Sequence, residues 1–206
     1  MHHKKLIPGF VCRDGKTFSL LGHPFCDSAE ELGLFSGSTG ADALLFADGS
    51  RTGEDHEAVI GTLRKTVRAA DIPVLAGGRV RRLEDVKKYL YAGAESVFLD
   101  AAEESNVDLL KEASDRFGSE RIGICLPDPS YESRLEEYAQ LGASYAILLS
   151  PGPLSKADSL PIPVFPVLRQ ESEEAAATML KAPSCGGLIL TEGWGRESGA
   201  GSCMEW

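Results

Sequence analysis

Short runs of apolar residues alternate with longer stretches of helical pattern along the whole chain of 206 residues. The runs are almost continuously hydrophobic, which is typical of strands in a parallel sheet that is covered on both faces. The runs expected to form strands are 6–12, 43–47, 73–76, 96–99, 122–126, 145–149, 164–168 and 188–191. Strict alternation of strand and helix predicts an α/β fold, a closed (βα)8 barrel of the TIM type, with an open doubly wound sheet as the alternative.

The stretches between these runs carry helical signals. Residues 57–70 place Val59, Ile60, Leu63 and Val67 on one stripe, as one buried helix face requires. Residues 83–91, 104–117 and 131–141 are the other expected helices, and the last two are followed by glycines that suit a helix end.

An internal repeat favours the barrel over the open sheet. Gly40-Ala41-Asp42, before the second predicted strand, returns as Gly142-Ala143-Ser144 before the sixth. Ile72-Pro73-Val74, at the third, returns as Ile162-Pro163-Val164 at the seventh. Two similar half-barrels joined end to end would produce this pattern.

The second half of the repeat is shorter than the first. Prolines between the sixth and seventh predicted strands leave little room for a full helix. The tail 192–206 is rich in glycine and has no helical period. We therefore expect one barrel domain over 1–191 without its last helix. Residues 192–206 are expected to be a Gly-rich tail or a junction to a following segment.

Charge and cysteine usage exclude several function classes. The net charge of −10 opposes binding to a nucleic-acid backbone. The five cysteines form no CxxC pair, and the four histidines have no metal-ligand spacing with them. No apolar run approaches the roughly 18 residues of a membrane span. The sequence predicts a cytoplasmic protein with no metal, no organic cofactor and no membrane or nucleic-acid partner.

Ligands of such barrels bind at the carboxyl ends of the strands, where two groups of residues stand out. Gly77-Gly78-Arg79 follows the third strand, and paired glycines allow close approach of the backbone to a phosphate. A Gly-rich turn beside a solvated basic helix start is the alternative. Asp48, Asp100 and Asp128 follow the second, fourth and fifth strands and are either acid–base groups or helix caps and turn residues.

Several motifs occur in an order that is typical of one family. They are Lys5-Leu6-Ile7-Pro8, Asp14-Gly15-Lys16, Gly40-Ala41-Asp42, Phe46-Ala47-Asp48, Ile72-Pro73-Val74, Gly77-Gly78, Ala92-Gly93-Ala94 and Arg116-Phe117-Gly118. Together they resemble the histidine-biosynthesis barrels, namely the cyclase subunit of imidazole glycerol phosphate synthase and the related ProFAR isomerase. The shortened second half resembles the N-terminal barrel of some bacterial phosphoribosyl-AMP cyclohydrolase/phosphoribosyl-ATP pyrophosphatase fusions.

The resemblance implies a ribotide substrate with a phosphate at each end and two aspartates that work as acid and base. At their positions this chain has Val11 and Pro127, neither of which can transfer a proton. The resemblance assigns Gly77, Gly78, Arg79 and position 100 to one phosphate site, where Asp100 would repel the ligand. The second phosphate site has lost its glycine pair, since residues 167–170 read Val-Leu-Arg-Gln.

These departures predict a catalytically impaired barrel domain that serves as a scaffold or as a phosphate- or ribotide-binding module. The alternative is an active cyclase (a lyase) or ribotide isomerase that uses displaced carboxylates, with Asp48 and Asp128 as the candidates. Phosphate or a phosphorylated ribotide is the expected ligand. A C-terminal fused domain or another histidine-biosynthesis subunit is the expected protein partner.

Overall fold

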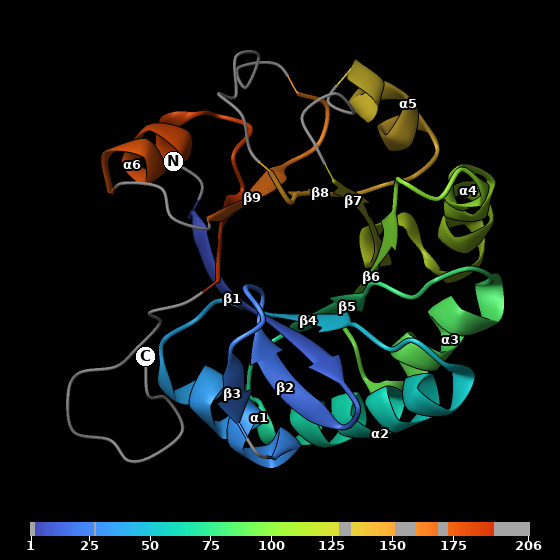
Figure 1. Cartoon of the computed structure of the whole chain (residues 1–206). Coiled ribbons are helices and arrows are strands. Elements are labelled where there is room, and N and C mark those ends of the chain that lie inside the picture. Colours follow the sequence, from blue (N-terminus) through green and yellow to red (C-terminus); the bar gives the residue numbers. More distant parts are fainter. Residues whose placement is uncertain (1–2, 27, 128–132, 151–159, 169–172, 192–206) are drawn as a thin grey trace.

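The computed structural model describes residues 3–26, 28–127, 133–150, 160–168 and 173–191. Within these ranges eight parallel strands form a closed barrel (Figure 1). They are β1 (Lys5–Arg13), β4 (Leu44–Asp48), β5 (Val74–Gly77), β6 (Ser96–Asp100), β7 (Ile122–Leu126), β8 (Ala146–Leu148), β9 (Val164–Leu168) and β10 (Gly187–Leu190). Parallel pairing of β10 with β1, with Ile7 opposite Ile189, closes the sheet. The predicted barrel is confirmed, and the open doubly wound alternative is wrong.

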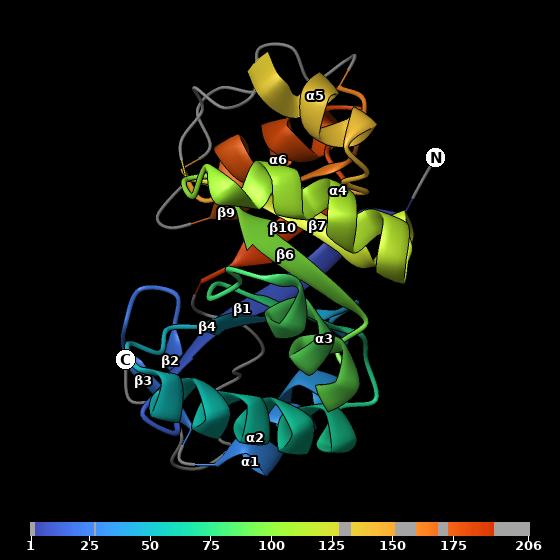
Figure 2. The same cartoon turned by 90° about the vertical axis from the view of Figure 1, so that its right-hand side faces the viewer.

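Helices lie on the outside of this ring, as Figures 1 and 2 show from two directions. They are α1 (Ala29–Ser38), α2 (Gly53–Ala69), α3 (Leu83–Ala92), α4 (Ser105–Phe117), α5 (Leu135–Gln140) and α6 (Glu173–Lys181), with a short 3-10 turn at Ser119–Arg121. The helix α2 begins one turn before its predicted start, because Thr52 caps it by accepting a hydrogen bond from the amide of Asp55. No helical stripe in the sequence had indicated α1 or α6.

A small antiparallel hairpin follows β1. It consists of β2 (Lys16–Ser19), which pairs with β1, and β3 (Pro24–Cys26). Asp14 and Gly15 form the turn with φ values of 51° and 70°. Two positive φ angles match the right-handed twist of the flanking strands, and glycine adopts them without strain. The motif Asp14-Gly15-Lys16 of the sequence thus forms the turn of this hairpin.

The strands divide their side chains between an inner and an outer core. The inner core fills the barrel with residues such as Ile7, Phe98, Cys125 and Ile147. The larger outer core lies between strands and helices and includes Phe10. Since successive side chains of a strand point to opposite faces, this alternation shows which residues at the strand ends face the barrel mouth.

The second half of the barrel is sparsely covered in the part of the chain that the structure describes. Between β8 and β9 the described residues contain no helix, and the proline-rich stretch 151–159 lies outside them. The predicted tail or junction 192–206 also lies outside the described residues. None of the helices in the described ranges combines the length and apolar character that a membrane crossing needs.

Candidate functional site

The barrel mouth lies at the carboxyl ends of the parallel strands. Four of the residues predicted for the site stand on the inner side of these ends: Val11 on β1, Gly77 on β5, Asp100 on β6 and Pro127 directly after β7. Their sides follow from the alternation, because Ile7, Phe98 and Cys125 belong to the inner core. The structure therefore brings these four positions to one opening.

Two positions in this opening have no group that exchanges protons. Val11 pairs with Ala47 of β4 and is half-buried, and Pro127 is half-buried at the end of β7. The third candidate carboxylate at the mouth, Asp128, lies outside the described residues. Among the predicted site residues that the structure describes, Asp100 is thus the carboxylate at the barrel mouth.

Asp100 is held in a tight turn at the start of the β6–α4 connection. One carboxylate oxygen, Oδ1, accepts a hydrogen bond from the amide of Ala102 at 2.9 Å. The side-chain amide of Asn106 donates to the main-chain oxygen of Asp100, also at 2.9 Å. Burial raises the pKa of the neighbouring Cys125 thiol, and the charge of Asp100 raises it further.

The glycine pair after β5 has a packing role of its own. A Cβ atom on Gly77 would lie 2.3 Å from the carbonyl oxygen of Phe98. Gly78 has φ +109°, and a Cβ there would lie 2.8 Å from the carbonyl oxygen of Asp48. Both positions therefore require glycine whether or not a phosphate binds, so the pair alone does not identify a phosphate site.

Asp48 does not face the mouth. Its neighbour Phe46 belongs to the outer core, and the fully buried Asp48 side chain points the same way, behind the barrel wall. There its Oδ2 lies 2.7 Å from His56 Nδ1 and accepts a hydrogen bond from the Tyr89 hydroxyl at 2.7 Å. The amide of Ser50 donates to Oδ1 at 2.8 Å. We expected Asp48 to lie with other carboxylates over the opening, and the structure shows that it does not.

His56 and Tyr89, the two side chains that contact Asp48 behind the wall, are not among the residues that the sequence pointed to. Burial raises the pKa of the Tyr89 hydroxyl, and the charge of Asp48 raises it further, so Tyr89 stays protonated and donates. A signal for His56 was present in the sequence, since it lies on the same helical stripe of α2 as Val59, Ile60 and Leu63. A polar residue on a buried stripe requires a buried partner.

Arg79 is also turned away from the barrel mouth. Its guanidinium Nη1 donates to the carbonyl oxygen of Ser50 at 3.0 Å. Its side chain lines a cavity outside the wall, together with His56. The structure therefore separates Arg79 from Gly77, with which the sequence analysis had grouped it.

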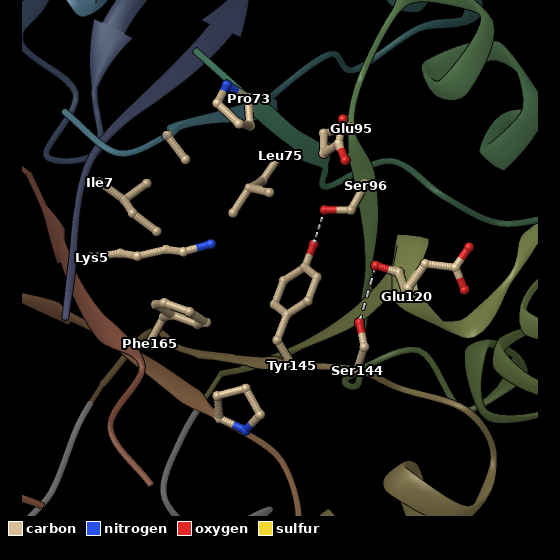
Figure 3. Close-up of a pocket in the computed structure, with 12 residues that line it drawn as sticks. Lys5, Ile7, Pro73, Leu75, Glu95, Ser96, Glu120, Ser144, Tyr145 and Phe165 are labelled. Atoms are coloured by element: carbon tan, nitrogen blue, oxygen red, sulfur yellow. Dashed lines mark hydrogen bonds between the residues drawn. The ribbon is translucent and has the colours of Figure 1, made fainter. Parts of the chain in front are cut away.

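A second cavity, of about 320 Å³, opens at the other end of the barrel, where the strands begin (Figure 3). Lys5 extends into it, and Tyr145 lies between Ser96 and Phe165. The Tyr145 hydroxyl and Ser96 Oγ are 2.9 Å apart, and the rings of Tyr145 and Phe165 meet edge to face at 6.1 Å. Burial raises the pKa of Tyr145. Tyr145 thus belongs both to the lining of this cavity and to the inner core.

The described residues contain no group of three or more His, Cys, Asp or Glu side chains that could hold a metal ion. The four cysteines among them, Cys12, Cys26, Cys125 and Cys185, are buried and form no disulfide with one another.

Comparison with known proteins identifies the family. The family model described as "Histidine biosynthesis protein" matches residues 23–128, which is more than half of the chain. The chain belongs to the histidine biosynthesis protein family. The matched segment contains Gly77, Gly78 and Asp100 of the mouth and the whole Asp48–His56–Tyr89 cluster. The family assignment that the motif order predicted is confirmed.

Individual relatives agree with this assignment. The chain is 32% identical to imidazole glycerol phosphate synthase subunit HisF of Staphylococcus saprophyticus over 141 residues, which is 67% of this chain and 56% of that protein. It is 33% identical to the same subunit of Staphylococcus aureus strain Newman over 134 residues, or 64% and 52%. This histidine-biosynthesis barrel spans only about half the length of these relatives in the match.

Proposed function

We propose that this histidine-biosynthesis barrel does not catalyse the family's cyclase reaction and serves as a scaffold or as a phosphate- or ribotide-binding module. The observation that carries the proposal is the pair Val11 and Pro127 at the barrel mouth. The resemblance puts an acid–base aspartate at each of these positions. Neither side chain holds a transferable proton, so both proton-transfer steps lose their group.

A phosphate half-site at the first of the two phosphate positions is part of the proposal. Gly77 ends β5 on the inner side of the mouth, and the positive φ of Gly78 turns the chain directly after it. Backbone N–H groups in such a turn are a common way to bind phosphate oxygens. Asp100 stands on the next strand and repels an anion, so we expect weak binding.

The proposal is tested by two measurements on the purified chain. The family's ribotide substrate should show no turnover above background. Titration with inorganic phosphate, followed by amide NMR, should shift the resonance of Gly78. NMR is preferred to a Gly77→Val variant, because the contact with the Phe98 carbonyl predicts that this variant will not pack. Turnover at an ordinary enzymatic rate would overturn the non-catalytic part, and unshifted Gly78 would overturn the half-site.

Asp100 supports one alternative, an active lyase or isomerase with displaced carboxylates. It is a carboxylate on the inner side of the barrel mouth, and a general acid or base needs that position. The alternative predicts ribotide turnover that Asp100→Asn or Asp128→Asn abolishes. Asparagine at position 100 keeps an oxygen for the Ala102 amide, so loss of turnover there would report lost proton transfer.

A protein partner and a compartment complete the proposal. The relatives are named as a subunit of a synthase, which supports binding of another histidine-biosynthesis subunit or of a C-terminal fused domain. The net charge of −10 argues against a nucleic-acid partner. The buried free cysteines agree with a reducing cytoplasm. Size-exclusion chromatography with candidate subunits tests the partner directly.

A further inference from the structure

A cavity of about 340 Å³ lies outside the barrel wall, between the starts of α2 and α3. Its lining includes four basic side chains, Arg79, Arg81, Arg82 and Lys88. Gly53, the first residue of α2, and the buried ring of His56 also line it. In a chain of net charge −10 this is a local concentration of positive charge at a helix N-terminus.

Two carboxylates share the cavity, and both already have partners. Glu57 accepts a hydrogen bond from Lys88, which holds the pKa of Glu57 below its usual range. Asp85 accepts hydrogen bonds from the amide of Arg81 at 3.2 Å and from Arg82 Nε at 3.4 Å.

These pairings leave two guanidinium groups in excess. The Arg81 side chain has no carboxylate partner within the described ranges, and Arg79 donates only to the neutral carbonyl of Ser50 there. Both side chains line the cavity, and the two carboxylates there are paired with Lys88 and Arg82. The lining therefore carries a net positive charge available to a ligand.

His56 supplies a second, independent observation. Its side chain is 6% exposed and lies against the cavity, with Nδ1 bound to Asp48. The other ring nitrogen, Nε2, is buried and has no hydrogen-bond partner among the described residues. A buried polar atom without a partner is costly, so such atoms usually have a ligand, ion or water beside them. Since Nδ1 is committed to Asp48, Nε2 is the ring atom left for a ligand.

We propose that this outer cavity is a phosphate-binding site, separate from the barrel mouth, for inorganic phosphate or a small phosphate monoester. Arg79 and Arg81 provide guanidinium donors suited to phosphate oxygens, and Gly53, the first residue of α2, lines the same space. A phosphate can accept a hydrogen bond from a protonated His56 Nε2 or donate its own O–H to a neutral one. Nothing in this site depends on the activity of the barrel mouth.

The test uses inorganic phosphate and glycerol phosphate as probes in separate titrations of the full chain. Amide and imidazole ¹⁵N resonances are followed for Gly53, His56 and Lys88 of the outer cavity and for Gly78 of the mouth. We expect the His56 Nε2 resonance to move with a dissociation constant of about 1 mM. A tighter response to glycerol phosphate than to phosphate assigns the site to a monoester, and the reverse assigns it to the free anion.

A matched pair of variants makes the test decisive. Arg81→Gln removes one exposed guanidinium of the cavity, and Arg64→Gln removes an exposed guanidinium elsewhere on α2. We expect Arg81→Gln to weaken the response of His56 about tenfold and Arg64→Gln to leave it unchanged. Equal affinity in the two variants, or no movement of His56 Nε2 in the parent chain, would overturn the proposal. Because Gly78 is followed separately, failure of the mouth half-site remains distinguishable.

Discussion

Asp48 and His56 meet behind the barrel wall, where the carboxylate Oδ2 and the imidazole Nδ1 are 2.7 Å apart. The two side chains are 0% and 6% exposed, so water does not compete for this contact. The pair links the end of β4 to the first turn of α2. It therefore fixes where α2 begins and how the outer cavity is shaped.

We predict that His56→Phe lowers the free energy of unfolding by about 2–4 kcal/mol, because it removes a partner of a buried carboxylate. Phenylalanine keeps the edge contact that the His56 ring makes with Tyr89, so packing is largely preserved. Asp48→Asn should cost less, because the asparagine oxygen still accepts from the Ser50 amide and its NH2 group can donate to the Tyr89 hydroxyl oxygen. Urea unfolding measures both. A His56→Phe variant as stable as the parent would contradict this role.

The sequence predicted the barrel well, because eight apolar runs separated by helical patterns define the alternation without long-range information. It did not predict which way Asp48 points. The run Leu44–Asp48 is apolar up to its last residue, so no period of two distinguishes the inner from the outer face. Only the register against β1 and β5 settles that, and register is a tertiary property.

The direction of the Arg79 side chain also depends on tertiary structure and could not be predicted from the sequence. In the sequence it directly follows Gly77-Gly78 and looks like part of one phosphate loop. The positive φ of Gly78 turns the chain between them, and the Arg79 side chain leaves on the outer side toward Ser50. Adjacent residues can thus serve different cavities, which spacing in the sequence does not reveal.

Tyr145 gives a second stability prediction. Tyr145→Phe removes the hydroxyl that bonds to the buried Ser96, so we expect a loss of about 1 kcal/mol in the free energy of unfolding. Tyr145→Ala should cost about 3–5 kcal/mol, because it leaves a cavity in the inner core. Tyr91→Phe is the matched control, since Tyr91 is 73% exposed and should show no change. Chemical denaturation followed by circular dichroism compares the three. Equal effects of Tyr145→Phe and Tyr91→Phe would refute the Ser96 contact.

The buried thiol of Cys12 predicts a pH dependence. Burial raises the pKa of the Cys12 thiol from its ordinary value of 9.0 to about 12. The unfolded chain therefore releases this proton at lower pH than the folded chain does. Its contribution to stability is complete below pH 9.0 and is lost as the pH rises toward about 12.

Cys12→Ala isolates this effect, because every other titrating group is common to the two proteins. The unfolding free energy of the parent should fall more steeply than that of Cys12→Ala as the pH rises above 9.0. In the folded parent, Cys12 should also react slowly with a thiol reagent at pH 8, since the thiolate is the reactive form. Parallel pH profiles for the two proteins would show that the Cys12 proton is not linked to folding.

Asp100 determines how the barrel mouth treats an anion. We predict that Asp100→Asn strengthens binding of inorganic phosphate at Gly78 about fivefold, because it removes a like charge worth about 1 kcal/mol near the ligand. The asparagine oxygen can still accept from the Ala102 amide, so the turn should be preserved. Amide NMR of Gly78 during the titration gives the affinity. The variant should leave the His56 response in the outer cavity unchanged, since Asp100 does not line it. If Asp100→Asn weakens phosphate binding instead, the carboxylate acts as a ligand-positioning group, and the repulsion argument fails.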